Sequence, residues 1–273
     1  MKYMLVSFFA AACLTANAQQ HSLEKVWETD TTIAVPESVL HDAGNKILYV
    51  SLIDGAPWDA DGKGGIGKIG PDGKGYKGNW VTSLNAPKGM GIFGNRLFVA
   101  DINNVVVIDI KKGSITNRIT IDSAAGLNDI TVTDAGIVYV SDSKSGKVFR
   151  IENDKPELYL ADLKGVNGLK YFKGDLYIGA GKLFVKANSN KQISTIAELP
   201  QGIDGIEPVG NGDFIVTSWG GYIFYVAAGG KFETLLDTHN EKRNSADIGY
   251  DSKKRMVYVP TFFAKTIAAY RLK

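Results

Sequence analysis

Six polar residues recur at one position of a repeated sequence pattern, and these side chains are the best placed to do chemistry. They comprise three carboxylates, two amides and one lysine: Glu37, Lys88, Asn128, Asn167, Asp204 and Asp247. Residues at equivalent positions of a repeat fold occupy equivalent places in space. We therefore expect the six to form one ring around a common centre. The alternative is that they only hydrate a water-filled channel and cap turns.

Three members of this set could bind a metal ion. Glu37, Asn167 and Asp204 offer carboxylate and amide oxygens, which suit a hard divalent cation. Ca²⁺ is the best match, and Zn²⁺, Mg²⁺ and Mn²⁺ are the alternatives. The three histidines occupy unrelated places in the repeats: His21, His41 and His239. Their positions argue against a histidine zinc site and against a Ser-His-Asp triad.

Aromatic residues in loops could add an apolar wall to the same ring. The longest loop, LIDGAPWDADGKGG, contains Trp58 and is expected to act as a lid or rim. Trp219 and the pair Phe262-Phe263 stand in equivalent loops of later repeats. Such side chains could contact a sugar ring or an acyl chain, or they could serve only as surface packing. The DADGKG portion resembles a calcium loop but lacks the final glutamate of an EF-hand.

The repeats themselves predict the fold. Their polar residues are spaced by 51, 40, 39, 37 and 43 positions, which is the length of a four-stranded propeller blade. Each repeat continues with short runs of β-branched and aromatic residues, bounded by Gly, Asp or Asn. The pattern predicts an all-β, six-bladed β-propeller of four-stranded blades, formed as a single domain by residues 19–273.

The last repeat is one strand short. The chain ends after TIAAYRLK, whereas the segment LEKVWETD precedes the first repeat. We predict that residues 24–30 pair beside residues 266–272, which would close the ring and remove a free sheet edge.

The first 18 residues are expected to be a secretory signal peptide. Lys2 is followed by an apolar stretch over residues 3–12 and by the sequence ANA before Gln19. The mature protein would be periplasmic or secreted. The alternative is a lipoprotein acylated at Cys13, the only cysteine, although Ala10 replaces the aliphatic residue expected there.

Composition limits the partners. The formal charge is +2 and the basic residues are scattered, so no nucleic acid partner is expected. No segment has the ~20 consecutive apolar residues of a transmembrane helix, so no membrane span is expected. A small molecule is the expected ligand.

One Glu, two Asn and one Asp occur in the motifs PES, LND, VNG and IDG. This order resembles the regucalcin–gluconolactonase (senescence marker) propellers over essentially the whole mature chain. The resemblance implies that Glu37, Asn167 and Asp204 hold a divalent metal and that Asn128 contacts substrate. It also implies that Asp204 serves as the base in lactone hydrolysis.

Two departures from the family pattern affect the substrate. Active lactonases of the family commonly carry an arginine where this chain has Gly126, and Lys88 adds a positive charge to the ring unless Asp247 pairs with it. We expect Lys88, Asp247, Trp58 and Trp219 to help bind substrate. The expected function is a metal-dependent hydrolase of a lactone or related ester. The alternative is a non-catalytic propeller, resembling NHL-type repeats, that binds a ligand or protein partner through its channel face.

Overall fold

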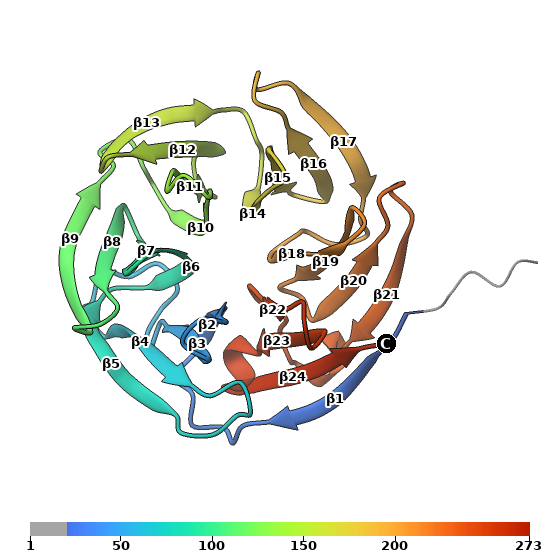
Figure 1. Ribbon diagram of the computed structural model, residues 1–273, viewed down its shortest axis with the longest axis horizontal. Helices are drawn as coiled ribbons and strands as arrows, with labels where there is room; N and C mark the ends of the chain where they lie inside the picture. The colour runs from blue at the N-terminus through green and yellow to red at the C-terminus, as the bar shows by residue number, and fades with distance from the viewer. Residues whose placement is uncertain (1–20) are drawn as a thin grey trace, which may run out of the picture.

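Short runs of β-branched and aromatic residues form 24 strands, arranged as six four-stranded sheets, in the part of the chain that the structure describes, residues 21–273. The structure is a computed structural model. Its sheets are placed radially around a central axis, like the blades of a propeller (Figure 1). Neighbouring strands within each sheet run antiparallel. The predicted all-β, six-bladed propeller is therefore confirmed.

The strands of each blade follow one another in the sequence. Blade one contains β2 (Pro36–Asp42), β3 (Ile47–Leu52), β4 (Gly64–Ile69) and β5 (Lys77–Leu84). Blade two contains β6 (Pro87–Phe93), β7 (Arg96–Asp101), β8 (Asn104–Asp109) and β9 (Ser114–Thr120). Blade three contains β10 (Leu127–Val132), β11 (Val138–Asp142), β12 (Lys147–Glu152) and β13 (Lys155–Leu160).

The second half of the ring repeats this order until the last blade. Blade four contains β14 (Val166–Phe172), β15 (Asp175–Ala180), β16 (Leu183–Ala187) and β17 (Ile193–Glu198). Blade five contains β18 (Ile206–Gly210), β19 (Asp213–Ser218), β20 (Tyr222–Val226) and β21 (Phe232–Asp237). Blade six contains β22 (Gly249–Asp251), β23 (Met256–Pro260), β24 (Ile267–Leu272) and, outermost, β1 (Leu23–Glu28). Two short 3-10 turns, His239–Glu241 and Phe262–Ala264, complete the elements.

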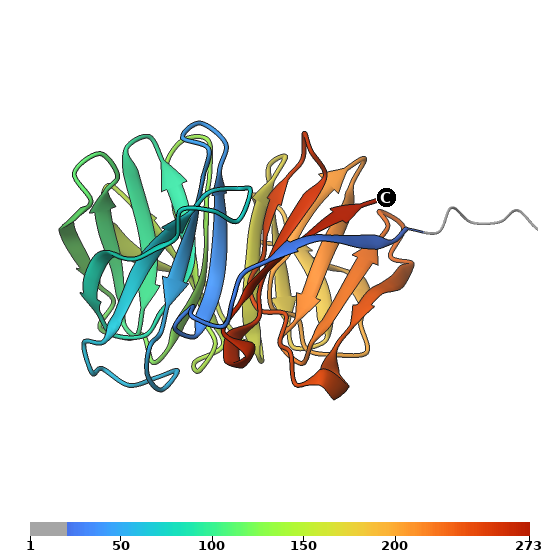
Figure 2. The same cartoon turned by 90° about the horizontal axis from the view of Figure 1, so that it is seen from below.

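Two contacts between the first and last blades close the ring, one at the periphery and one near the central axis. At the periphery β1 pairs antiparallel with β24, from Leu23 opposite Leu272 to Glu28 opposite Ala268 (Figure 2). Near the axis the Asp247 N–H donates to the Glu37 carbonyl at 3.1 Å, which joins the innermost segments of blades six and one. The predicted pairing of the chain ends is confirmed.

The hydrophobic core lies between neighbouring blades. Each of the six contacts between adjacent blades contains its own cluster of buried apolar side chains. Phe98 of β7 and Phe149 of β12, for example, belong to the cluster between blades two and three. This packing fixes each innermost strand relative to its neighbours, so it also fixes the side chains at the channel.

The expected signal peptide, residues 1–18, lies outside the described residues. Within residues 21–273 no helix is long and apolar enough to cross a membrane.

Candidate functional site

A cavity of about 220 Å³ opens at one mouth of the channel. It is lined by five of the six repeated polar residues together with aromatic and proline side chains: Glu37, Lys88, Asn128, Asn167, Asp204, Pro57, Trp58, Trp219 and Phe262. The residues expected to meet at the channel mouth therefore do so, with the exception of Asp247. Trp58 and Trp219, expected from their loops, join them.

A local irregularity of the innermost strands presents the polar side chains. In β2, β6, β10 and β14 the pairing with the next strand shifts register at the polar residue. A β-bulge of this kind re-aims the side chain and leaves backbone groups unpaired. In three blades a hydroxyl group on the second strand accepts a hydrogen bond from the backbone N–H of the residue that comes after the polar residue. Ser51 accepts from Ser38, Ser141 from Asp129 and Thr217 from Gly205, at 2.8–2.9 Å. Sequence reasoning missed these hydroxyls, although YVS, YVSD and IVTS recur in the repeats.

Buried aspartates hold the loops that enter two innermost strands. Asp101, which is fully buried, accepts the backbone N–H groups of Asn85 and Ala86 at 2.9–3.1 Å. Asp142 likewise accepts those of Ala125 and Gly126 at 2.7–3.0 Å. These loops lead directly to Lys88 and Asn128, so the aspartates position site residues without entering the cavity. Neither aspartate was predicted to have a role from the sequence.

Glycines allow the innermost segments to approach one another. A Cβ at Gly168 would lie 1.8 Å from the Asp204 carbonyl oxygen, far inside van der Waals contact. A Cβ at Gly205 would lie 2.7 Å from the Ile248 backbone nitrogen. The pairs Asn167-Gly168 and Asp204-Gly205 therefore combine a polar residue of the cavity with the small residue that lets the next blade come close.

Two buried oxygens in the cavity lack hydrogen-bond partners among the described residues. They are Glu37 Oε2 and Asn167 Oδ1, in side chains that both line the cavity with Asp204. Unpaired buried oxygens are costly unless a ligand or ion satisfies them. Their chemistry, with the Asp204 carboxylate, suits a hard divalent cation. In the described part of the chain no group of three His, Cys, Asp or Glu is placed to bind a metal. A metal in this cavity would therefore also need the amide oxygen of Asn167 as a donor.

Burial makes negative charge expensive in the cavity. It raises the pKa of Asp204 to about 8, with repulsion from Asp247 adding to the rise and Asn167 and Lys88 opposing it. Burial also raises the pKa of Glu37 well above its usual range, against the attraction of Lys88. A divalent cation would reverse this balance because it stabilises the ionised carboxylates.

Lys88 is tied to the long loop of blade one. Its Nζ donates to the Pro57 carbonyl at 2.5 Å and to the Ala86 carbonyl at 3.2 Å, and lies 4.2 Å from the centre of the Trp58 ring. Among residues 21–273, no carboxylate oxygen lies within 4.0 Å of this ammonium group. Burial lowers the pKa of Lys88, and the Glu37 carboxylate counteracts that shift.

Trp58 occupies the space beside Gly126. A Cβ at Gly126 would lie 2.9 Å from Cζ3 of the Trp58 ring and 2.8 Å from the Lys144 side chain. Lys144 Nζ lies 4.5 Å from the centre of the same ring, so two lysines make cation–π contacts with Trp58. The indole thus forms a wall of the cavity next to Gly126.

Blades five and six supply a second aromatic wall. Trp219 packs edge-on against Phe262 and Phe263, with ring centroids 5.5 Å and 5.9 Å apart. Phe262 is buried, whereas Trp219 is 44% exposed and Phe263 is 58% exposed. The rim of the cavity is therefore apolar and accessible on this side.

Asp247 lies deeper in the channel. Its Oδ2 accepts the Ser38 hydroxyl at 2.5 Å, and its side chain lines a separate void of about 20 Å³. The Lys170–Glu207 ion pair, at 2.8 Å, borders the same void. Asp247 therefore does not pair with Lys88. The ammonium group of Lys88 is not neutralised by Asp247, and Lys88 lines the cavity of the candidate site.

The comparisons with known proteins concern the fold. No protein-family model and no curated protein matches the sequence. Among solved structures, a candidate gluconolactonase superposes with a TM-score of 0.68 at 12% identity, covering 94% of this chain and 93% of its own. A streptogramin B lyase gives 0.67 at 13% identity over 93% and 98% of the two chains. A luciferin-regenerating enzyme gives 0.66 at 13% identity over 93% and 95%.

These likenesses confirm the resemblance to gluconolactonase propellers at the level of the fold. The three similar proteins carry names of different activities, in keeping with the many functions that propellers support. The function of this chain must therefore be argued from its own cavity.

Proposed function

We propose that this protein is a metal-dependent hydrolase of the gluconolactonase type that acts on a lactone or related ester. The observation that carries the proposal is the pair of unpaired buried oxygens, Glu37 Oε2 and Asn167 Oδ1, beside the Asp204 carboxylate. These three residues would hold the cation, Ca²⁺ by preference. The location that we propose, periplasmic or secreted, rests on the resemblance of residues 1–18 to a secretory signal peptide.

Each polar residue of the cavity has a separate role in the proposed hydrolysis. A cation held by Glu37, Asn167 and Asp204 would supply Lewis-acid chemistry: it would polarise the substrate carbonyl and make water more acidic. Asp204 accepts the proton of the attacking water and later returns it to the leaving oxygen. Asn128 orients the substrate: its Nδ2 donates to Ser143 Oγ at 2.9 Å, which fixes the amide at the cavity wall. Lys88 adds positive charge where an oxyanion develops.

The walls of the cavity narrow the substrate class. Trp58 lies where an arginine would bind the hydroxyls of a sugar lactone, and Trp219 and Phe262 face the cavity from the other side. A volume of about 220 Å³ suits a small ligand. We therefore propose a compact lactone or ester with an apolar face and few hydroxyl groups.

A non-catalytic propeller that binds a partner through its channel face is the rival function. The exposed Trp219 and Phe263 at the rim favour it, because exposed aromatic side chains are common at binding surfaces. The position of Lys88 favours the hydrolase. Its ammonium bonds to loop carbonyls and leaves the oxygens of Glu37 and Asn167 free for an ion.

The test is hydrolysis of a panel by the purified protein, before and after treatment with a chelator. The panel contains glucono-δ-lactone, γ-butyrolactone and phenyl acetate. We expect activity that is lost on chelation and restored by Ca²⁺, with the two weakly hydroxylated substrates preferred. A protein that hydrolyses none of them with any of Ca²⁺, Mg²⁺, Mn²⁺ or Zn²⁺ would favour the rival function.

A further inference from the structure

A second cavity lies on the face opposite the candidate active site. Its volume is about 520 Å³, and it is bordered by the turns that join β2 to β3, β4 to β5 and β22 to β23. The candidate active site is bordered instead by loops such as the one joining β3 to β4. The two cavities are therefore at opposite ends of the innermost strands, and the second cavity lies between blades one and six.

The floor of this second cavity contains a buried polar pair. His41 Nε2 lies 3.8 Å from Asp251 Oδ2, and the two side chains are only 9% and 11% exposed. The His41 ring also packs against Tyr258, with centroids 5.7 Å apart. Because His41 belongs to β2 and Asp251 to β22, the pair spans the seam between the first and last blades.

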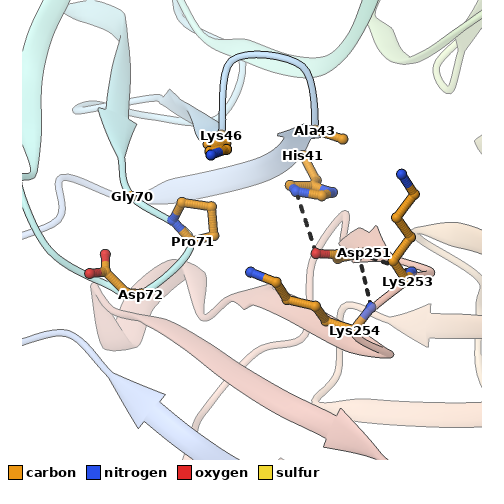
Figure 3. Close-up of a pocket in the computed structure, with 9 residues that line it drawn as sticks. All are labelled: His41, Ala43, Lys46, Gly70, Pro71, Asp72, Asp251, Lys253 and Lys254. Atoms are coloured by element: carbon orange, nitrogen blue, oxygen red, sulfur yellow. Dashed lines mark hydrogen bonds and ion pairs between the residues drawn. The ribbon is translucent and has the colours of Figure 1, made fainter.

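Three lysines surround this floor, as Figure 3 shows: Lys46, Lys253 and Lys254. Asp251 Oδ1 accepts the backbone N–H groups of Lys253 and Lys254 at 3.0 Å and 3.1 Å, which fixes the turn that carries both. Their side chains extend on either side of Asp251 (Figure 3). Within the described residues, no carboxylate lies within 4.0 Å of any of the three ammonium groups.

The charges of the cavity favour an anion at one end. Asp251 Oδ1 accepts two backbone N–H groups, and its Oδ2 faces His41 Nε2 at 3.8 Å. Asp72 borders the far side, where its Oδ1 accepts the Lys74 N–H at 3.1 Å. The three lysines outnumber the carboxylates of Asp72 and Asp251 that border the cavity, which leaves an excess of positive charge on the side of Lys253 and Lys254.

We propose that this cavity is a binding site for a small multivalent oxyanion, a phosphate or a polycarboxylate. Lysine ammonium groups act as point charges, so they accept either class of anion without the fixed geometry that arginine imposes. His41 would donate a further hydrogen bond from the floor. Asp72 would accept a hydroxyl of the ligand on the opposite side. This site is independent of the proposed hydrolase, because it shares no lining residue with the cavity of the candidate active site.

The test is calorimetric titration at low salt with inorganic phosphate and with citrate. We expect at least one of them to bind with a Kd of about 1 mM or tighter. Two lost charge-assisted contacts should weaken binding by about tenfold or more in the double variant Lys253→Gln/Lys254→Gln. The matched control is Lys111→Gln/Lys112→Gln, an exposed pair in the β8–β9 turn with the same change of net charge. It should change the affinity by less than about twofold.

The titration separates this site from its alternatives. Binding of phosphate alone would identify a phosphate site, and binding of citrate alone a carboxylate site. A wild-type protein that binds neither anion with a Kd of about 1 mM or tighter would overturn the proposal. So would equal losses in the two double variants, because those would indicate a general charge effect. Glu37→Gln changes only the candidate active site, so it should leave anion binding unchanged. The anion-binding result therefore does not depend on whether the protein is a hydrolase.

Discussion

We propose two roles for Asp204, as a ligand of the cation and as the base that accepts a proton from water. Both roles depend on its negative charge, so replacing Asp204 with asparagine tests them. Asp204→Asn keeps the volume and one oxygen but removes the negative charge. It should weaken Ca²⁺ binding and lower turnover by the ~10²–10⁴-fold typical of a lost general base. Stability in metal-free buffer should be unchanged or slightly higher, because repulsion from Asp247 disappears. Asp134→Asn, an exposed substitution with the same charge change, is the control.

Kinetics, calcium titration and thermal melting of the two variants check this expectation. Full lactonase activity in Asp204→Asn would remove the base from the mechanism. An equal loss in Asp134→Asn would show that the net charge of the protein, and not the side chain in the cavity, controls activity.

The buried carboxylates also predict how stability depends on pH. Burial raises the pKa of Asp204 to about 8 and that of Asp247 to about 7, both above the 3.8 of an exposed aspartate. The folded protein therefore holds protons that the unfolded chain releases, so metal-free protein should lose stability as pH rises from about 4 to 8. Ca²⁺ should offset this loss, with a stabilising effect that grows over the same range.

Thermal melts at several pH values, with Ca²⁺ and with a chelator, measure both effects. A melting temperature of the metal-free protein that rises steadily from pH 5 to pH 8 would contradict the assigned charges. Sodium chloride at equal ionic strength controls for general screening.

The choice of site residues was predictable because each repeat carries one polar residue at the same position. Glu37, Lys88, Asn128, Asn167 and Asp204 meet at one cavity for that reason. The deeper placement of Asp247 was not predictable. It depends on the Ser38 hydroxyl and on backbone bonds between blades six and one, which the pattern of a single repeat does not contain.

At the level of strands and loops, the innermost segments depend on glycine for their close approach. Gly168→Ala would place a methyl group 1.8 Å from the Asp204 carbonyl oxygen, so either β14 or the segment before β18 must move. We expect a loss of about 1–3 kcal/mol in the free energy of unfolding. Ca²⁺ affinity should fall as well, because Asn167 and Asp204 would no longer share one centre.

Chemical denaturation and calcium titration test this variant. Gly229→Ala is the control for the loss of glycine itself, since nothing lies within 4 Å of a Cβ built there and its backbone is not in the left-handed region. Wild-type stability and calcium affinity in Gly168→Ala would show that the blades do not need this approach.

The strands themselves could be predicted, whereas the long loop of blade one could not. Short alternating runs with Gly, Asp and Asn at their ends indicate strands from local sequence alone. The position of Trp58 depends on Lys88, Lys144 and the missing side chain of Gly126, which lie in other blades. Sequence reasoning identified the loop as a lid or rim without that placement.

The whole molecule depends on the strand that closes its ring. A chain beginning at Asp30 lacks β1 and would expose the edge of β24 to other molecules. It would also lose the Trp27 side chain, which packs against the cluster between blades six and one. We expect aggregation, or a melting temperature lower by roughly 10 °C or more.

Differential scanning calorimetry and light scattering compare this truncation with a chain that begins at His21. An unchanged, cooperative melt without aggregation would contradict the role of β1 in closing the ring. The repeat count predicted this closure because the last repeat lacks one strand and the first is preceded by one.

Calcium binding to metal-free protein tests the central claim most directly. Calorimetric titration of the wild type should show one ion per chain. Both Glu37→Gln and Asn167→Ala should weaken binding by at least about tenfold, because the first removes a negative charge from the donor set and the second removes an oxygen ligand. Glu198→Gln, a carboxylate exposed on β17, should bind as the wild type does. A wild-type protein that binds none of Ca²⁺, Mg²⁺, Mn²⁺ and Zn²⁺ would contradict the metal site and the hydrolase that depends on it.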